Sequence, residues 1–343
     1  MGLISRHHGI LLVLIAILML VFIAASGCSE PKTTVTVVPR AEAIPADIDK
    51  IIPEIDEFAP VVHNPLWENP VPLEGPINTL GAEDSPFITS DGNILYFFFT
   101  PDVRVPVEKQ IIDGATGVYW SKKVDGVWAD PERLLLNDDV SMDGCICMQG
   151  DTLWFASVRR GNLGTIDVYT ASYQDGKWTD WKNAGEQLNR ELDIGEFHIT
   201  PDGNTIYFGW VKNGTTDSGS IWENNRDIYR SDKVNGVWSE PANLGPNVNS
   251  GGMEDQPFIS VDGSELWFTG QSRLGYTGPA VFRSVKMQNG EWGRAEEIIS
   301  NFAGEPTLDA AGNIYFVHHY YRDGTMIEAD IYIASKNEAI QLR

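Results

Sequence analysis

The chain has 343 residues, of which 42% are hydrophobic and 10% aromatic, so it can form one large folded unit or two smaller ones and is not a disordered chain. Asp and Glu number 48 against 25 Lys and Arg, which gives a formal net charge of -23. A field of this sign repels phosphate backbones, so the composition excludes nucleic acid as a partner and favours a cation or a neutral polar ligand.

The N-terminus has the layout of a signal peptide. Arg6 precedes an apolar run from Ile10 to Ala25, and the run ends in Ala24-Ala25-Ser26-Gly27-Cys28. These last residues resemble the lipobox of bacterial lipoproteins, which implies cleavage after residue 27 and a lipid on Cys28. The alternative is one membrane-spanning helix, because the run is only slightly shorter than the roughly 20 residues that a bilayer requires. Both readings place the rest of the chain outside the cytoplasm, anchored to a membrane of the cell envelope.

Residues 28–66 are rich in Pro, Thr, Val and acidic residues and predict a flexible tether. The folded domain is then expected over residues 67–343.

Within that domain, five segments align on a glycine that follows a short apolar run: residues 86–92, 144–150, 197–203, 257–263 and 306–312. A β-branched or aromatic run follows each glycine, which is the signature of a β-hairpin, and a third apolar run follows the second. In the first four units an Asp-Gly or Asn-Gly turn leads into a fourth strand that carries a tryptophan. Four antiparallel strands repeated in this way predict the blades of a β-propeller.

The fifth unit ends after its third strand, and its missing strand is found at the other end of the domain. Residues 67–73 (Trp-Glu-Asn-Pro-Val-Pro-Leu) are similar to residues 238–244 (Trp-Ser-Glu-Pro-Ala-Asn-Leu) of the third unit. An N-terminal strand that completes the last blade would leave no open sheet edge. The sequence therefore predicts an all-β, five-bladed propeller of four-stranded blades, closed by an N-terminal strand.

The repeats resemble the WD40-like propeller repeat called PD40, found in TolB and in propeller domains of tricorn-type and prolyl-oligopeptidase-type peptidases. The residues that carry the resemblance are Thr200-Pro-Asp-Gly203 followed by Ile206-Tyr-Phe208, with Ser90-Asp-Gly92 and Val261-Asp-Gly263 similar. Gly150 and Gly312 lack the preceding Asp. A peptidase is not expected, because the chain has no Gly-x-Ser-x-Gly and no room for a separate catalytic domain.

Candidate site residues stand seven positions before each aligning glycine, at the entry of the innermost strand: Ser85, Asp143, Glu196, Gln256 and Glu305. Asp84 and Asp255 lie beside two of them. In a closed ring these side chains would gather around the axis at the end that carries the long loops. They would form either a solvated channel mouth or a site, since clustered carboxylates raise one another's pKa or hold a cation such as Ca²⁺. No other cofactor is expected.

Further candidates are weaker. Arg159 and Arg273 follow second strands and would pair with the acidic ring or bind an anionic ligand. His198, on the third innermost strand, is either a packed core residue or a ligand-binding one. Several aromatic residues of the loops would offer flat faces to sugar rings or simply pack there: Trp210, Trp222, Tyr276, Tyr320 and Tyr321. Cys145 and Cys147 are expected as buried free thiols, with a metal pair as the alternative.

Two functions from different classes remain. The first is a monomeric binding or scaffolding module for carbohydrate, another surface polymer or an envelope protein. The second is a glycoside hydrolase, in which Asp143, Glu196 and Glu305 are the catalytic carboxylates. In that case Glu196 is the proton donor, because Phe197 beside it makes its surroundings apolar, and Asp143 is the base or nucleophile.

The lipobox-like run generates the first prediction. Replacing Cys28 with Ser removes the thiol that the lipid needs, so we expect Cys28→Ser to release the chain from the membrane or to leave it unprocessed. Membrane fractionation and the mass of the N-terminal peptide measure this. An uncleaved chain that is extracted from the membrane like the wild type would support the membrane-spanning alternative.

Overall fold

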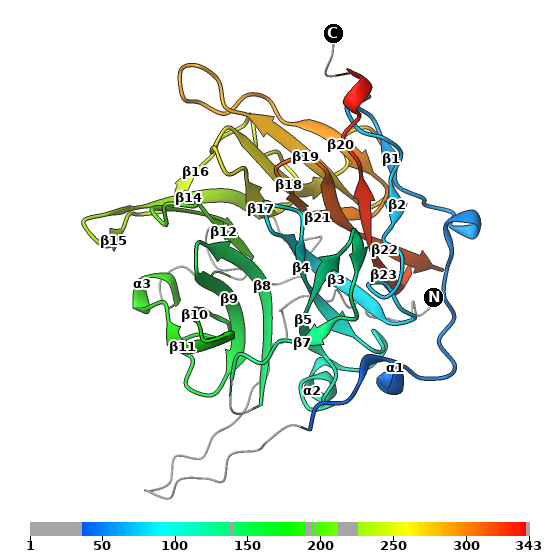
Figure 1. Cartoon of the computed structure of the whole chain (residues 1–343). Coiled ribbons are helices and arrows are strands. Elements are labelled where there is room, and N and C mark those ends of the chain that lie inside the picture. Colours follow the sequence, from blue (N-terminus) through cyan, green and yellow to red (C-terminus); the bar gives the residue numbers. More distant parts are fainter. Residues whose placement is uncertain (1–35, 138–139, 190–193, 195, 212–225, 341–343) are drawn as a thin grey trace, which may run out of the picture.

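The computed structural model describes residues 36–137, 140–189, 194, 196–211 and 226–340. These residues form five antiparallel sheets around one axis, which confirms the predicted five-bladed propeller (Figure 1). The few helices are single turns: α1 (Arg40–Ala43), α2 (Val107–Gln110), α3 (Glu186–Asn189), η1 (Pro53–Ile55) and η3 (Glu338–Ile340).

The strands follow the predicted order from the axis outward. The first blade contains β3 (Ala82–Ile88), β4 (Ile94–Thr100), β5 (Gly117–Val124), β6 (Val127–Trp128) and β7 (Glu132–Arg133). The second contains β8 (Ser141–Gln149), β9 (Thr152–Arg159), β10 (Asp167–Gln174) and β11 (Lys177–Asn183). The third contains β12 (Phe197–Ile199), β13 (Thr205–Trp210), β14 (Asp227–Val234), β15 (Val237–Trp238) and β16 (Ala242–Asn243).

The last two blades each take a strand from the N-terminal part of the chain. The fourth contains β17 (Glu254–Ile259), β18 (Glu265–Gln271), β19 (Pro279–Val285) and β20 (Glu296–Ser300), with β1 (Val61–Val62) at its edge. The fifth contains β21 (Ala303–Leu308), β22 (Ile314–Arg322) and β23 (Thr325–Ala334), with β2 (Val71–Pro72) as its outer strand.

The ring closes as the sequence predicts. In β2, Val71 pairs with Ile333 and Pro72 with Tyr332 of β23, antiparallel. The innermost strands contact one another around the whole axis in the order β3, β8, β12, β17, β21 and back to β3. The first and last blades therefore adjoin, and the N-terminal strand covers the edge that the fifth blade would otherwise expose.

The hairpin motif that carries the repeat has one structure in three blades. Thr89 donates its hydroxyl to Asp91, Asp91 accepts the Asn93 amide, and Gly92 has a φ of 71° that an L side chain would strain. The same bonds are made around Asp202 in the third blade and Asp262 in the fourth. A fully buried phenylalanine lies two or three residues after the first residue of the second strand in every blade: Phe97, Phe155, Phe208, Phe268 and Phe316.

Residues 36–66 correct the predicted tether. Arg40 donates to buried Glu83 of the first blade at 3.0 Å, and Lys50 forms an ion pair with Asp330 of the fifth at 2.6 Å. Ile51 is buried, and Val61 and Val62 pair with β20 of the fourth blade. In Figure 1 this part of the chain runs along the outside of the propeller. It is bound there because buried carboxylates need cations, which a composition-based reading does not reveal.

The signal-like run, Cys28 and residues 28–35 lie outside the described residues. Within the described ranges, no helix is long and apolar enough to cross a membrane.

Ring closure generates the second prediction. The Trp67 side chain is buried, donates its indole N–H to the Gly312 carbonyl at 2.9 Å and meets Trp267 edge-on. We expect Trp67→Ala to lower the free energy of unfolding by about 3–5 kcal/mol, since it opens a cavity where the ring closes. Urea unfolding measures this. Val71→Thr, at a position 54% exposed in β2, is the control and should change stability by less than about 0.5 kcal/mol.

Candidate functional site

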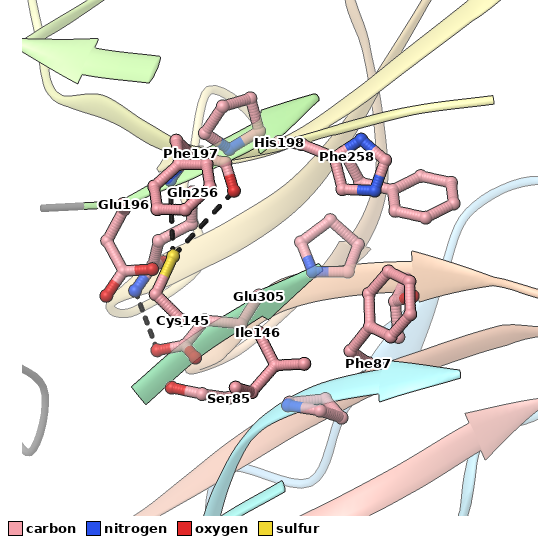
Figure 2. A pocket seen from close by; sticks show the side chains of 14 residues that line it. Ser85, Phe87, Cys145, Ile146, Glu196, Phe197, His198, Gln256, Phe258 and Glu305 are labelled. Carbon is pink, nitrogen blue, oxygen red and sulfur yellow. Dashed lines mark hydrogen bonds between the residues drawn. The ribbon is translucent and has the colours of Figure 1, made fainter. Parts of the chain in front are cut away.

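A cavity of about 50 Å³ lies on the propeller axis, lined by one short stretch from each innermost strand. A water molecule occupies about 30 Å³ of liquid, so the cavity has room for one or two waters or an ion, and not for a sugar ring. Figure 2 shows Ser85, Cys145, Glu196, Gln256 and Glu305 brought together from five different blades.

Backbone irregularities aim four of these side chains at the axis. The register of the innermost strand slips at the same place in the first, second, fourth and fifth blades. The slipped residues have positive φ angles without being glycine: Ser85 (47°), Cys145 (50°), Gln256 (54°) and Glu305 (53°). A β-bulge of this kind redirects a side chain and is strained for a non-glycine residue. The bulges around this cavity therefore lower the stability of the fold.

Both glutamates of the cavity have raised pKa values; Glu305 is buried and Glu196 is half-buried. Burial, reinforced by nearby Asp255, raises the pKa of Glu196 from 4.5 to about 8. Burial also raises the pKa of Glu305 well above its ordinary value, with Asp84 and Glu196 adding to the effect. Gln256 donates its side-chain N–H to Glu305 Oε1 at 2.6 Å. At neutral pH Glu196 therefore holds a proton that it could donate.

Asp143 does not line the cavity, contrary to the prediction from spacing. The β8–β9 hairpin of the second blade is two residues shorter between its paired strands than the hairpin of the first, because Met148 pairs with Leu153 whereas Ile88 pairs with Leu95. The residue seven positions before Gly150 therefore lies two positions before the one that faces the axis. Cys145 occupies the axial position instead.

The Asp143 carboxylate is held by its own blade. It accepts hydrogen bonds from Ser141, Ser157 and Arg159, with an Arg159 distance of 2.6 Å. A carboxylate with these partners stabilises its blade.

Arg159 and Arg273 have the same structural role in their blades. Arg159 lies over the Tyr169 ring, and Arg273 lies over the Phe282 ring while it donates to buried Glu254 at 3.0 Å. Both guanidinium groups form ion pairs with carboxylates of the protein. Pairing with acidic side chains was one of the two roles that the sequence suggested for them.

His198 lines the cavity as a packed core residue. Its Nδ1 accepts the Ile259 amide at 3.3 Å, and its ring packs between Phe87 and Phe258. Burial lowers the pKa of His198 to about 3, so the imidazole is neutral. Cys145 and Cys147 are buried free thiols, and burial raises the pKa of both.

Asp84 and Asp255 occupy the same position in the first and fourth blades, one residue before the bulge. Each accepts the next residue's backbone amide, from Ser85 at 2.8 Å and from Gln256 at 2.9 Å. The second oxygen of Asp255 accepts from Arg226 at 3.1 Å. The corresponding Asp84 Oδ2 has no hydrogen-bond partner among the described residues.

A larger hollow, of about 700 Å³, lies between the first and second blades. We call it the inter-blade groove. Its aromatic lining is Tyr96, Trp120, Tyr173, Trp178 and Trp181, and its polar lining includes Glu132, Asp151 and Lys177. The repeat pattern does not reveal this groove, because its two walls are about 50 residues apart in the chain; in the sequence Trp178 is only the tryptophan of a fourth strand.

The loop aromatics singled out by sequence do not form such a surface. Tyr320 is fully buried and its hydroxyl bonds Tyr332 at 2.8 Å, while Tyr321 stacks on Phe302 with ring centroids 4.2 Å apart. Trp210 packs edge-on against Tyr229, and Tyr276 lies exposed beside His63. Trp222 lies outside the described residues.

No protein-family model matches the chain, and no curated protein matches it. Several solved structures are similar in shape. A protein of unknown function from Dyadobacter fermentans is 13% identical, covers 80% of this chain and 100% of its own, and has a TM-score of 0.44. The arabinanase of Bacillus subtilis is 12% identical over 76% of this chain and 96% of its own, also with a TM-score of 0.44.

A glycosyl hydrolase from Bacteroides ovatus is 9% identical over 73% of this chain and 84% of its own, with a TM-score of 0.41. The assignment of five blades rests on the strand pairing described above, and these likenesses carry no information about activity.

The raised pKa of Glu196 generates the third prediction. Folded Glu196 keeps its proton up to about pH 8, whereas the unfolded chain loses it near 4.5. Its contribution to stability is therefore complete below pH 4.5 and is lost as the pH rises through 8, with a slope of up to about 1.4 kcal/mol per pH unit. We expect Glu196→Gln to flatten the fall in unfolding free energy over this range in metal-free buffer.

The control for this measurement is Glu240→Gln, which changes an exposed carboxylate outside the cavity. It should leave the pH dependence as in the wild type. Equal slopes for wild type and Glu196→Gln would mean that Glu196 ionises normally in the folded protein.

Proposed function

We propose that this protein is a non-catalytic propeller that binds a neutral carbohydrate polymer in the inter-blade groove. The observation that carries the proposal is the groove itself: about 700 Å³ of space beside five aromatic side chains. This volume lies within the range of about 300–1,000 Å³ that is common for small-molecule sites, whereas the axial cavity is far smaller.

The chemistry of the groove suits a sugar. Pyranose rings have an apolar C–H face that packs on aromatic rings, and Tyr173 (52% exposed) and Trp178 lie next to each other with centroids 5.0 Å apart. Hydroxyl groups at the rim of a sugar require acceptors and donors, which Glu132, Asp151 and Lys177 supply.

The net charge of -23 selects among polymers. It disfavours polymers rich in uronic acid or phosphate, since the acidic surface repels them at ordinary ionic strength. A neutral glycan is the polymer class that the charge and the groove both accept.

The remaining features are proposed together with this role. Lipidation at Cys28 would hold the propeller at an envelope membrane, outside the cytoplasm. The Asp-Gly turns at residues 91–92, 202–203 and 262–263 would make these blades members of the WD40-like PD40 repeats.

A glycoside hydrolase is the second candidate, favoured by one observation. Glu196 and Glu305 are two carboxyl groups with raised pKa values in one cavity, and a carboxyl that is protonated at neutral pH is what a proton donor requires. The cavity of about 50 Å³ disfavours it, because the scissile bond must lie between the two carboxyls.

The fourth prediction tests the groove. The full chain, solubilised in detergent, is screened on an array of neutral polysaccharides, and affinities for the hits are measured by calorimetry. We expect Trp178→Ala and Trp120→Ala each to weaken binding by about tenfold or more, since each removes a stacking surface. Tyr276→Ala, which removes an exposed aromatic outside the groove, is the control and should bind like the wild type.

The hits are also incubated with the wild type to measure hydrolysis. If oligosaccharides are released, and release stops in Glu196→Gln, the hydrolase is correct and the binding module is wrong. If binding survives both tryptophan substitutions, the groove is not the site.

A further inference from the structure

The Asp84 carboxylate differs from its counterpart in the repeated blades. Its counterpart Asp255 has one oxygen on a backbone amide and the other on Arg226. Asp84 repeats the first bond, but its Oδ2 has no hydrogen-bond partner within the described residues, although the side chain is fully buried. An ionised oxygen removed from water with no partner is energetically costly, so the position calls for a cation that Arg226 supplies in the other blade.

Several other buried carboxylates of the propeller have a basic partner. Glu83 pairs with Arg40, Asp143 with Arg159, Glu254 with Arg273, and Glu328 and Asp330 with Lys50. Asp84 instead faces another acid, Glu305, and an imidazole, His319, whose Nε2 is 3.8 Å from Asp84 Oδ1. Asp84 thus lacks the arginine or lysine that these neighbours have.

These three side chains form a compact donor set. Asp84 is on β3, Glu305 on β21 and His319 on β22, and all three are buried. One oxygen of each carboxylate and one imidazole nitrogen lie within 4.8 Å of one another. Donor atoms bound to one ion at about 2.0–2.2 Å are up to about 4 Å apart, so small side-chain rotations would bring these three onto a shared ion.

We propose that Asp84, Glu305 and His319 bind one divalent transition-metal ion, such as Zn²⁺ or Mn²⁺, beside the axial cavity. One nitrogen and two oxygens favour such a metal over the all-oxygen coordination that Ca²⁺ prefers, which refines the Ca²⁺ expected from sequence. Glu305 also lines the axial cavity, which leaves room for a water as a further ligand. The bound ion would fix β3 of the first blade to β21 and β22 of the last, next to the ring closure.

Metal binding by the full chain tests this proposal. The purified protein is stripped with a chelator and dialysed against Zn²⁺ or Mn²⁺ alone, and bound metal is counted by elemental analysis and by the Mn²⁺ resonance signal. We expect about one ion per wild-type chain and a rise in Tm on metal addition. Asp84→Asn and His319→Gln should each lower the affinity by at least about tenfold and remove the rise in Tm.

Asp255→Asn is the matched control, because it alters the same position in the blade that already has its arginine. It should still bind one ion, and Trp178→Ala in the inter-blade groove should too. A wild-type chain that binds no ion, or an Asp84→Asn chain that keeps one, would overturn the proposal. If Asp84→Asn does not fold, His319→Gln decides the outcome by the same measurements.

Discussion

The desolvation of carboxylates at one end of the propeller governs much of this structure. The innermost strands carry acids into a region that water does not reach, and each acid needs a cation or a proton to remain there. The chain provides arginines from neighbouring strands and loops, such as Arg159 and Arg273, which also cover aromatic rings of their own blades. Where no such arginine exists, the N-terminal segment supplies Arg40 and Lys50. The path of residues 36–66 along the blades follows from this requirement.

The same strands explain why the axis is a poor place for a large ligand. Bulges at Ser85, Cys145, Gln256 and Glu305 turn side chains inward, and prolines after three of them keep that backbone extended. The inward side chains fill the channel down to a cavity of about 50 Å³. Small occupants, such as a proton, a water or an ion, fit there. A polymer requires a larger surface such as the inter-blade groove, where tryptophan side chains of two blades are partly exposed to solvent.

Closure of the ring joins these features. Because β2 completes the fifth blade, residues that precede it in the chain must cross the outside of blades one, five and four, and there they meet Glu83, Asp330 and β20. The fold therefore uses one stretch of chain to close the last sheet and to neutralise acids in two blades. A deletion near residue 40 would consequently affect the propeller even though it lies outside the five repeats.

The sequence by itself determined the blade count, the strand order and the closing strand, because strand and turn propensities act over a few residues and repeat at a regular interval. It also predicted that Glu196 and Glu305 lie at the axis. Only the tertiary structure decided that Cys145 replaces Asp143 at the axis, since a hairpin two residues shorter shifts the register without altering the motif. The other features join residues about 30 to 280 positions apart in the chain: the inter-blade groove, the ion pairs of Arg40 and Lys50, and the cluster of Asp84 with His319. Such contacts depend on how blades pack, which no local pattern encodes.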